Sequence, residues 1–215
     1  MKSFLIIGMG TFGHHLCKEL AKQKCEIMAA DSRPEMLEDV LPYVVSAKIA
    51  DCANEEVLCS FDIPSFDACF VCIGGNFQYS LEITSLLKEL GAKKVFSKAD
   101  EDIQAKFLLR IGADEVIYPE LDAAARIAIS ESSDSIFDCI PLSGDYAIYE
   151  IEAPSKWVGR TIRELNIRRN FNLNILAVKG AGVLNAMPDI DYTFKREEHL
   201  IVMGKKDDIW RVIEK

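Results

Sequence analysis

The sequence lacks any hydrophobic run long enough to cross a membrane. A bilayer-spanning helix needs about 20 consecutive apolar residues, and no stretch of the 215-residue chain approaches this length. The apolar segment at residues 1–7 is too short for a signal peptide and runs directly into a glycine motif. We therefore expect a cytoplasmic protein without direct membrane insertion, for which any membrane role requires a partner.

Positive charge is also scarce. The chain has 25 Lys and Arg against 34 Asp and Glu, a formal net charge of −9. Proteins that bind the phosphate backbone of nucleic acids need a basic surface that releases counterions. The acidic balance argues against nucleic acid as a partner, and with it against a redox-responsive transcription regulator.

Histidine is rare, and cysteine occurs without the paired spacing of a zinc ribbon or a disulfide framework. The seven cysteines are an odd number, as expected of small apolar residues in a reducing compartment. Cys69 and Cys72 form a C-x-x-C pattern, but they lie inside an apolar run, so we interpret them as buried strand residues. We interpret His14, His15 and His199 as surface or core-edge residues and expect no metal site.

The sequence does contain a regular alternation of short β-rich runs and helical patterns over its first 118 residues. This alternation is typical of a parallel sheet covered by helices on both faces. Glycines at positions 91 and 112 predict the ends of two of the helices. The expected strands are residues 4–7, 26–30, 47–50, 68–73, 94–97 and 115–118.

A polar segment at residues 130–135 has the composition of a linker, and the pattern changes after it. We therefore predict an α/β doubly wound parallel Rossmann sheet in residues 1–132 and a small α+β domain in residues 136–215. The elements expected in the second domain are strands 146–152, 173–179 and 199–203, a turn at Gly180 and Gly182, and helices 159–165 and 207–213.

The strongest motif is Gly8-Met9-Gly10-Thr11-Phe12-Gly13, which follows the first expected strand and opens the first helix. In this G-x-G-x-x-G pattern the first glycine permits a tight turn, the second lets a phosphate approach the backbone, and the third lets helix pack on strand. Asp31, 23 residues after Gly8, ends the second strand, where a carboxylate can accept both ribose hydroxyls. The combination predicts binding of an adenosine diphosphate moiety. The carboxylate disfavours a 2′-phosphate, which leaves NAD, ATP, ADP and AMP open.

A second cluster follows the fourth expected strand. Ile73-Gly74 would cover the nucleotide from the other side of the topological switch point, and Asn76 can equally serve as a helix N-cap. Asp51 ends the third strand and has the same two interpretations, an adenine contact or a cap.

The motif occurs in dehydrogenases, but the rest of the sequence lacks what such an enzyme needs. A nicotinamide enzyme requires a substrate-binding region with an acid or base near the cofactor. The chain has no Tyr-x-x-x-Lys pair, and its second domain is small. We therefore predict that the nucleotide is a signal and not a substrate. A small NAD-dependent oxidoreductase is the alternative.

Several further segments accompany the glycine motif, and Gly112-Ala113-Asp114 followed by Pro119-Glu120 is the most specific of them, because a dehydrogenase has no reason for it. With them, the whole chain resembles the RCK proteins, the regulators of conductance of potassium, and most closely the KtrA/TrkA type. The other matching segments are Asp51-Cys52-Ala53-Asn54, Ile73-Gly74, residues 86–90, Lys98-Ala99, Ile111, Leu165-Asn166-Ile167-Arg168, residues 175–178 and residues 200–204.

The resemblance implies a set of nucleotide-binding residues. The three motif glycines would hold phosphates, the acid at position 31 the ribose, residues 51–52 the adenine side, and residues 73–74 the other face of the nucleotide. A lysine near the phosphates and an acid near the γ-phosphate across a dimer complete the set. That acid has a second interpretation as a helix N-terminal residue that interacts with the dipole. The implied residues are Gly8, Gly10, Thr11, Phe12, Gly13, Asp31, Ser32, Asp51, Cys52, Ile73, Gly74, Lys98 and Glu120.

The resemblance also implies partners and a location. Such proteins form homodimers that assemble into an octameric ring, which docks on a membrane-embedded potassium channel or transporter at the inner face of the cell membrane. ATP or ADP is the expected ligand, with NAD, NADH or AMP as alternatives. Thr11 stands where many KtrA proteins have an arginine that contacts the terminal phosphate, which weakens the expectation of discrimination between ATP and ADP.

The second domain raises one further ligand. Some KtrA proteins bind cyclic di-AMP there, and Arg160, Arg163, Arg168 and Arg169 form a basic cluster that phosphates would suit. A solvated helix face explains the same cluster. We favour the solvated face and assign no ligand to this domain.

Overall fold

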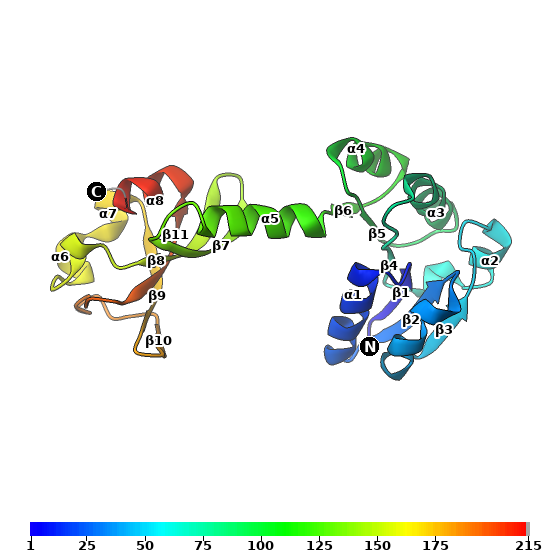
Figure 1. Cartoon of the computed structure of the whole chain (residues 1–215), viewed down its shortest axis with the longest axis horizontal. Helices are drawn as coiled ribbons and strands as arrows, with labels where there is room; N and C mark the ends of the chain where they lie inside the picture. The colour runs from blue at the N-terminus through cyan, green and yellow to red at the C-terminus, as the bar shows by residue number, and fades with distance from the viewer. Residues whose placement is uncertain (214–215) are drawn as a thin grey trace. The chain divides into compact units, whose positions relative to one another are not determined.

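The computed structural model describes residues 1–213 and divides into two compact units, Met1–Leu121 and Asp122–Lys215. The first unit contains a six-stranded sheet in which all neighbouring strands are parallel, with the order β3-β2-β1-β4-β5-β6 (Figure 1). Strand order reverses beside the central β1, which confirms the doubly wound Rossmann architecture. The strands are β1 Ser3–Ile7, β2 Glu26–Asp31, β3 Ser46–Ile49, β4 Ala68–Val71, β5 Val95–Lys98 and β6 Glu115–Ile117.

Two apolar clusters cover the two faces of this sheet. Successive side chains of a strand point to opposite faces, so Leu5 and Ile7 of β1 join one cluster and Ile6 joins the other. All four residues of β4 are buried, as expected of a central parallel strand. The helical elements of the first unit are α1 Thr11–Lys22, η1 Pro34–Met36, η2 Glu38–Tyr43, α2 Glu55–Cys59, η3 Ile63–Ser65, α3 Phe77–Glu89 and α4 Asp102–Ile111. The next helix, α5 Pro119–Ser130, lies mostly in the second unit.

Glycines end two of these helices in the predicted way. Gly112 is the C-cap of α4 with φ of 119°, and Gly91 follows α3 with φ of 84°. Both values lie in the region where only glycine is free of strain, so each helix stops where the sequence predicts.

The second unit contains a five-stranded antiparallel sheet with the order β10-β9-β11-β8-β7. Its core is built around the fully buried side chain of Trp157, which packs against Phe171 and Phe194 at ring-centroid distances of 5.1 and 5.8 Å. The elements are β7 Ile136–Ser143, β8 Tyr146–Glu152, η4 Ser155–Trp157, α6 Ile162–Leu165, α7 Ile167–Phe171, β9 Asn174–Gly180, β10 Val183–Ala186, β11 His199–Lys205 and α8 Lys206–Ile213.

The structure differs from the sequence-based expectation at several elements of this unit, among them the short helices η4 and α7, which were not predicted. Strands β7 and β10 were not predicted: register shifts interrupt β7 around Asp138 and Pro141, and every residue of the edge strand β10 is exposed. The expected helix at residues 159–165 is shorter, because Gly159 has φ of 81° and the helix begins after Thr161. The Thr161 side chain accepts a hydrogen bond from the Glu164 N–H and completes a capping box.

The division between the units lies at the start of α5, whereas the sequence-based boundaries, 1–132 and 136–215, place that helix in the first domain. The contacts of α5 explain the difference. Ile129 packs against the core of the second unit, and the Arg126 guanidinium forms two hydrogen bonds of 2.7 and 2.9 Å to the Asp138 carboxylate.

Candidate functional site

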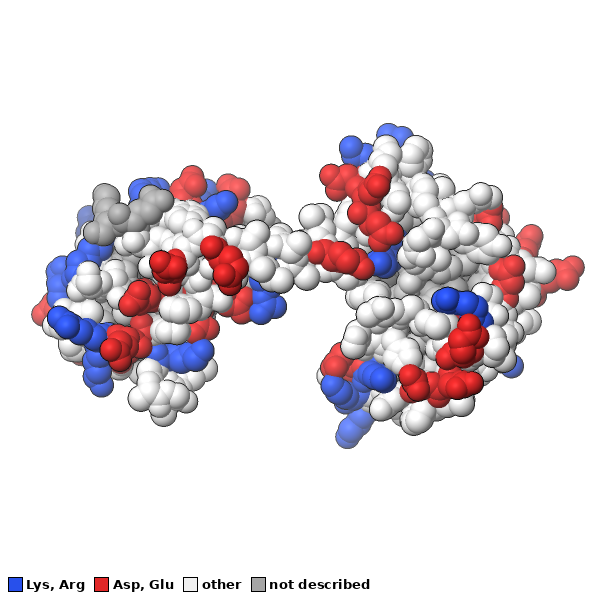
Figure 2. All heavy atoms as spheres, in the orientation of Figure 1, with Lys and Arg blue, Asp and Glu red and all other residues white. Residues whose placement is uncertain are grey.

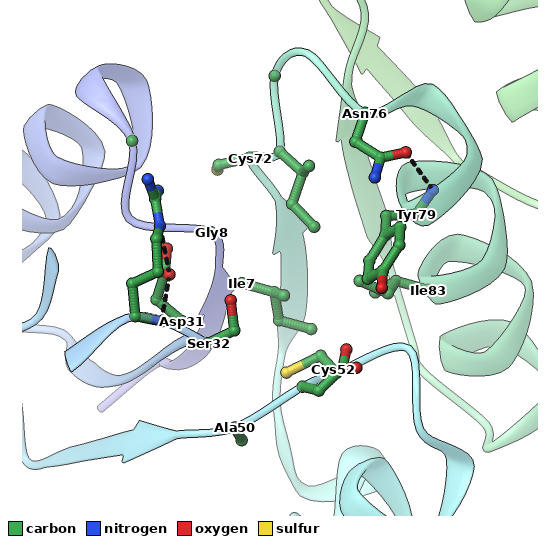
Figure 3. A pocket seen from close by; sticks show the side chains of 15 residues that line it. Ile7, Gly8, Asp31, Ser32, Ala50, Cys52, Cys72, Asn76, Tyr79 and Ile83 are labelled. Carbon is green, nitrogen blue, oxygen red and sulfur yellow. Dashed lines mark hydrogen bonds and ion pairs between the residues drawn. The ribbon is translucent and has the colours of Figure 1, made fainter.

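A cavity of the first unit lies at the carboxyl ends of β1, β2, β3 and β4, beside the N-terminal half of α3 (Figure 3). Ligands of doubly wound sheets bind at this edge, where the strand order reverses. Its volume of about 360 Å³ falls within the range of small-molecule sites. The lining residues are Ile7, Gly8, Gly10, Asp31, Ser32, Arg33, Ala50, Asp51, Cys52, Cys72, Ile73, Gly74, Asn76, Tyr79 and Ile83.

The three glycines of the loop after β1 differ in what surrounds them. Gly8 has φ of 90°, and its N–H donates to the Ala30 carbonyl at 2.9 Å. A Cβ on Gly13 would overlap the Gly8 carbonyl oxygen, so only glycine lets α1 lie this close to β1. A Cβ on Gly10 would meet nothing within 4 Å. The backbone is therefore open to the cavity at Gly10, where α1 begins.

The N-terminus of α1 faces this loop without an acidic side chain in its first turn. The first N–H groups of a helix have no partner within the helix and carry the positive end of its dipole. Anions such as phosphates bind at such termini. Thr11 is exposed in this turn, while Phe12 packs into the core between α1 and the sheet. Thr11, Phe12 and Gly13 do not line the cavity. They form the first turn of α1, whose backbone N–H groups lie at the helix N-terminus.

Asp31 is 7% exposed and is held by two backbone N–H groups. Its Oδ2 accepts from the Met9 N–H at 2.8 Å, and its Oδ1 accepts from the Arg33 N–H at 2.9 Å. A carboxylate has about four acceptor positions, so further hydrogen bonds remain available on the cavity side. Ser32 lies beside it on the same rim, and the Arg33 side chain approaches Asp31 through Nε at 3.5 Å.

The ends of β3 and β4 form the facing parts of the wall. Asp51 Oδ1 accepts from the Ala53 N–H at 3.1 Å, and the cap of α2 is Asn54 instead. Asn76 both caps α3 and lines the cavity, so its two interpretations hold together. Burial, and then the Asp51 and Asp31 carboxylates, raise the pKa of the Cys52 thiol to about 12, so this side chain is neutral and apolar.

Lys98 and Glu120 lie outside the main cavity. Lys98 lines a smaller cavity of about 130 Å³ together with Ser80, whose buried hydroxyl has no hydrogen-bond partner among residues 1–213. The Lys98 ammonium pairs with Glu120 at 2.8 Å and with Asp100 at 3.1 Å. Burial lowers the pKa of Lys98, but the two carboxylates outweigh it and leave the pKa raised. The hydrogen bond from Lys98 lowers the pKa of Glu120.

These two cavities adjoin each other. Ile73 lines both, and a Cβ on Gly74 of the main cavity would lie 3.3 Å from the Lys98 Nζ. The main cavity thus brings together eight of the thirteen residues expected from the sequence, and Lys98 stands at its edge. The eight are Gly8, Gly10, Asp31, Ser32, Asp51, Cys52, Ile73 and Gly74.

Sequence reasoning missed other parts of the wall. Cys72 was interpreted only as a buried strand residue, although it also lies at the end of β4. Tyr79 and Ile83 project from α3, four positions apart and therefore on one helix face. The spacing predicts that the two side chains share a helix face, but it does not predict that this face lines the cavity. Arg33 directly follows the predicted residue Ser32, and Ala50 directly precedes the predicted residue Asp51.

Three further observations concern metal sites, membrane spans and surface charge in the described part of the chain. No group of three or more His, Cys, Asp or Glu residues in it has the geometry of a metal site. None of its helices has the length and apolar character of a membrane span. Acidic side chains are distributed over the visible surface of both units (Figure 2).

The fold and this cavity define a class: proteins that join a Rossmann-type domain, open for a ligand at its switch point, to a small α+β domain. The TrkA-N domain model matches residues 4–119, and the TrkA-C domain model matches residues 146–215. The chain therefore belongs to the KtrA/TrkA family of potassium-uptake proteins with RCK-type domains.

Its curated relatives match it over nearly their whole length. The Ktr system potassium uptake proteins C and A of Bacillus subtilis (strain 168) are 36% and 37% identical, over 98% of this chain and 95% of each relative. The Ktr system potassium uptake protein A of Vibrio alginolyticus is 29% identical over 97% of this chain and 94% of the relative.

Solved structures share the fold at low identity. The GsuK RCK domain superposes with a TM-score of 0.68 at 16% identity, over 100% of this chain and 48% of that chain. The GsuK channel bound to NAD superposes with a TM-score of 0.70 at 15% identity, over 100% of this chain and 40% of that chain. The AMP-bound form of the Kef CTD from Shewanella denitrificans gives 0.53 at 20%, over 61% of this chain and 80% of that chain. The chain spans about half or less of the GsuK chains.

Proposed function

We propose that this chain is a non-enzymatic regulatory subunit that controls a membrane potassium channel or transporter in response to a bound adenine nucleotide. The observation that carries the proposal is the open cavity at the switch point of a TrkA-N domain, with Gly10 and the N-terminus of α1 on one side and the Asp31 carboxylate on the other. A phosphate and a ribose are the groups that these two features suit.

Each part of the nucleotide has residues suited to it. The glycine loop of Gly8, Gly10 and Gly13 and the first turn of α1, with the Thr11 hydroxyl, receive the phosphates. Asp31 and Ser32 receive the ribose hydroxyls. The adenine lies toward Asp51 and Cys52, and Ile73-Gly74 cover the other side of the nucleotide.

The end of the phosphate chain is proposed to reach Lys98. This lysine adjoins Gly74, and its charge is shared between Asp100 and Glu120. A terminal phosphate that binds Lys98 competes with these carboxylates, so the length of the phosphate chain changes the Lys98–Glu120 ion pair. ATP and ADP then differ from AMP in what happens at Glu120, the second residue of α5.

The relatives support the choice of transport system. The two Bacillus subtilis relatives are potassium uptake proteins, and NAD and AMP are bound in two of the structural neighbours. We propose that this chain acts in the cytoplasm at the inner face of the membrane through its partner. A homodimer that assembles into a ring of eight is the proposed form.

The test is direct binding to the full chain by isothermal titration calorimetry with ATP, ADP, AMP, NAD and NADH. At least one of these should bind, without turnover over hours of incubation. Gly10→Val places a side chain in the open space at the start of α1 and should weaken binding at least tenfold. Its melting temperature without ligand serves as the control, because no neighbour lies within 4 Å of the added Cβ. Failure of all five ligands to bind the native chain would refute the proposal, and steady nicotinamide turnover would favour an oxidoreductase.

Assembly can be tested separately. Light scattering of the native chain, with and without ATP, should give a mass of a dimer or a larger ring. A monomer under every condition would contradict the ring form while leaving nucleotide binding to be judged by calorimetry.

A further inference from the structure

Among the residues of the cavity wall without a role in the scheme above, Tyr79 is a large aromatic one. Tyr79 lies in the first turn of α3 and extends toward the part of the cavity that Cys52 forms (Figure 3). It is a large aromatic side chain with 40% of its surface exposed. Its hydroxyl has no hydrogen bond to any residue in the described range 1–213. An aromatic ring in this situation is available for contact with a ligand.

The backbone beneath Tyr79 is well anchored. Asn76 Oδ1 accepts a hydrogen bond from the Tyr79 N–H at 3.3 Å and fixes the start of the helix. One turn further, Ile83 is 1% exposed and lines the same wall. The ring therefore stands on a fixed helix end with an apolar residue next to it, and the wall at this place is apolar.

The wall formed by the end of β3 presents two small apolar side chains, Ala50 and Cys52, on either side of the exposed Asp51. Cys52 is 3% exposed, and burial raises the pKa of its thiol to about 12, so it carries no charge at neutral pH. Ala50 lies two residues before it and also lines the cavity. The part of the cavity between this wall and α3 is suited to a flat, weakly polar group, whereas the part near Asp31 and the glycine loop is suited to hydroxyls and phosphates.

We propose that Tyr79 stacks on the base of the bound nucleotide and holds it against the Cys52 wall, which makes Tyr79 a positioning residue for the ligand. This inference rests on the proposed function, because it requires that the cavity binds a nucleotide. Base–aromatic stacking needs only a π-face and no hydrogen-bond pattern. The contribution of Tyr79 is therefore the same for every ligand that carries the base, whatever its phosphate chain.

The experiment compares four variants of the full chain by calorimetry with AMP, ADP, ATP and NAD. Tyr79→Ala should weaken the binding of every ligand that the native chain binds by roughly 5- to 100-fold, as loss of a base–aromatic stack does. Tyr79→Phe should stay within about twofold of the native chain, because the ring remains. Tyr79→Leu keeps apolar volume without a π-face and should fall between the two. Tyr43→Ala is the matched control, since Tyr43 is 43% exposed in the same unit and does not line the cavity.

Each outcome decides between explanations. If Tyr79→Ala or Tyr79→Leu binds as the native chain does, the stacking role is wrong while the nucleotide site stands. If the loss with Tyr79→Ala differs strongly between AMP and ATP, Tyr79 acts on the phosphates and the inference is also wrong. If the native chain binds no adenine nucleotide, the proposed function fails and the inference with it. Equal melting temperatures of the ligand-free variants establish that the losses do not come from unfolding.

Discussion

In the first unit both faces of the sheet are covered and every residue of β4 is buried, whereas in the second unit buried and partly exposed residues alternate along β8. The doubly covered parallel sheet leaves only its edges and strand ends for a ligand, and its cavity lies at the strand ends. The antiparallel sheet keeps one face half open, where Glu150 contacts Lys179 and His199 from the two next strands. The two sheets thus have separate cores of different build. Three substitutions test whether these cores are also independent in stability.

The largest expected effect is in the second core. Trp157→Ala removes a fully buried indole and should destabilise the second unit by about 3–5 kcal/mol. Urea unfolding followed by the fluorescence of Trp210, the other tryptophan of the chain, measures the change. Hydrogen exchange in the first unit serves as the control and should stay unchanged. Equal loss of protection in both units would show that their cores are coupled.

A smaller loss, confined to the first unit, is expected for Gly13→Ala. The new Cβ would overlap the Gly8 carbonyl oxygen, and relief requires a shift of α1 that should cost about 1–3 kcal/mol. Both tryptophans lie in the second unit, so the circular dichroism transition should move while the tryptophan fluorescence transition stays in place. Gly10→Ala, at a φ of −68° with open space around its Cβ, is the matched control and should leave both transitions unchanged. A fluorescence shift in Gly13→Ala would contradict independent cores.

The smallest effect concerns acid stability of the second unit. Burial raises the pKa of Glu150, but the bonds from Lys179 and His199 outweigh it, and the pKa is lowered from the usual 4.5. A carboxyl with a lower pKa in the folded state stabilises the fold above its unfolded pKa, and this contribution is lost as the pH falls through the folded pKa. Glu150→Gln should therefore flatten the loss of stability below pH 4.5, as measured by the fluorescence of Trp157 and Trp210, which both lie in the second unit. An unchanged acid profile would mean that the contacts of Glu150 are lost to solvent screening.

Much of the first unit could be predicted from sequence, because a parallel sheet imposes its order on the chain. Each strand end is followed by a helix start, so Gly8, Asp31, Asp51 and Ile73 converge although they are far apart in the chain. The spacing between the glycine loop and Asp31 carries this information directly.

The remainder depended on tertiary packing. Tyr79 and Ile83 line the cavity only because of how α3 docks on the sheet end, which its periodicity leaves open. In the second unit, β10 is an exposed edge strand with no alternation of burial to read, and β7 contains Pro141 and register shifts. Edge strands and irregular strands carry weak sequence signals because few of their side chains are constrained by a core.

The Asp31 carboxylate has a consequence for how the cavity responds to a ligand. It ties the Met9 N–H of the glycine loop to the Arg33 N–H after β2, so protein hydrogen bonds alone hold this cradle, the glycine loop and the end of β2, together. A ligand that enters it gives up little of its affinity to ordering the protein. Under the proposed function, filling the cradle by itself transmits little change of shape, and ligands that fit it equally well are distinguished by the contacts of their far ends.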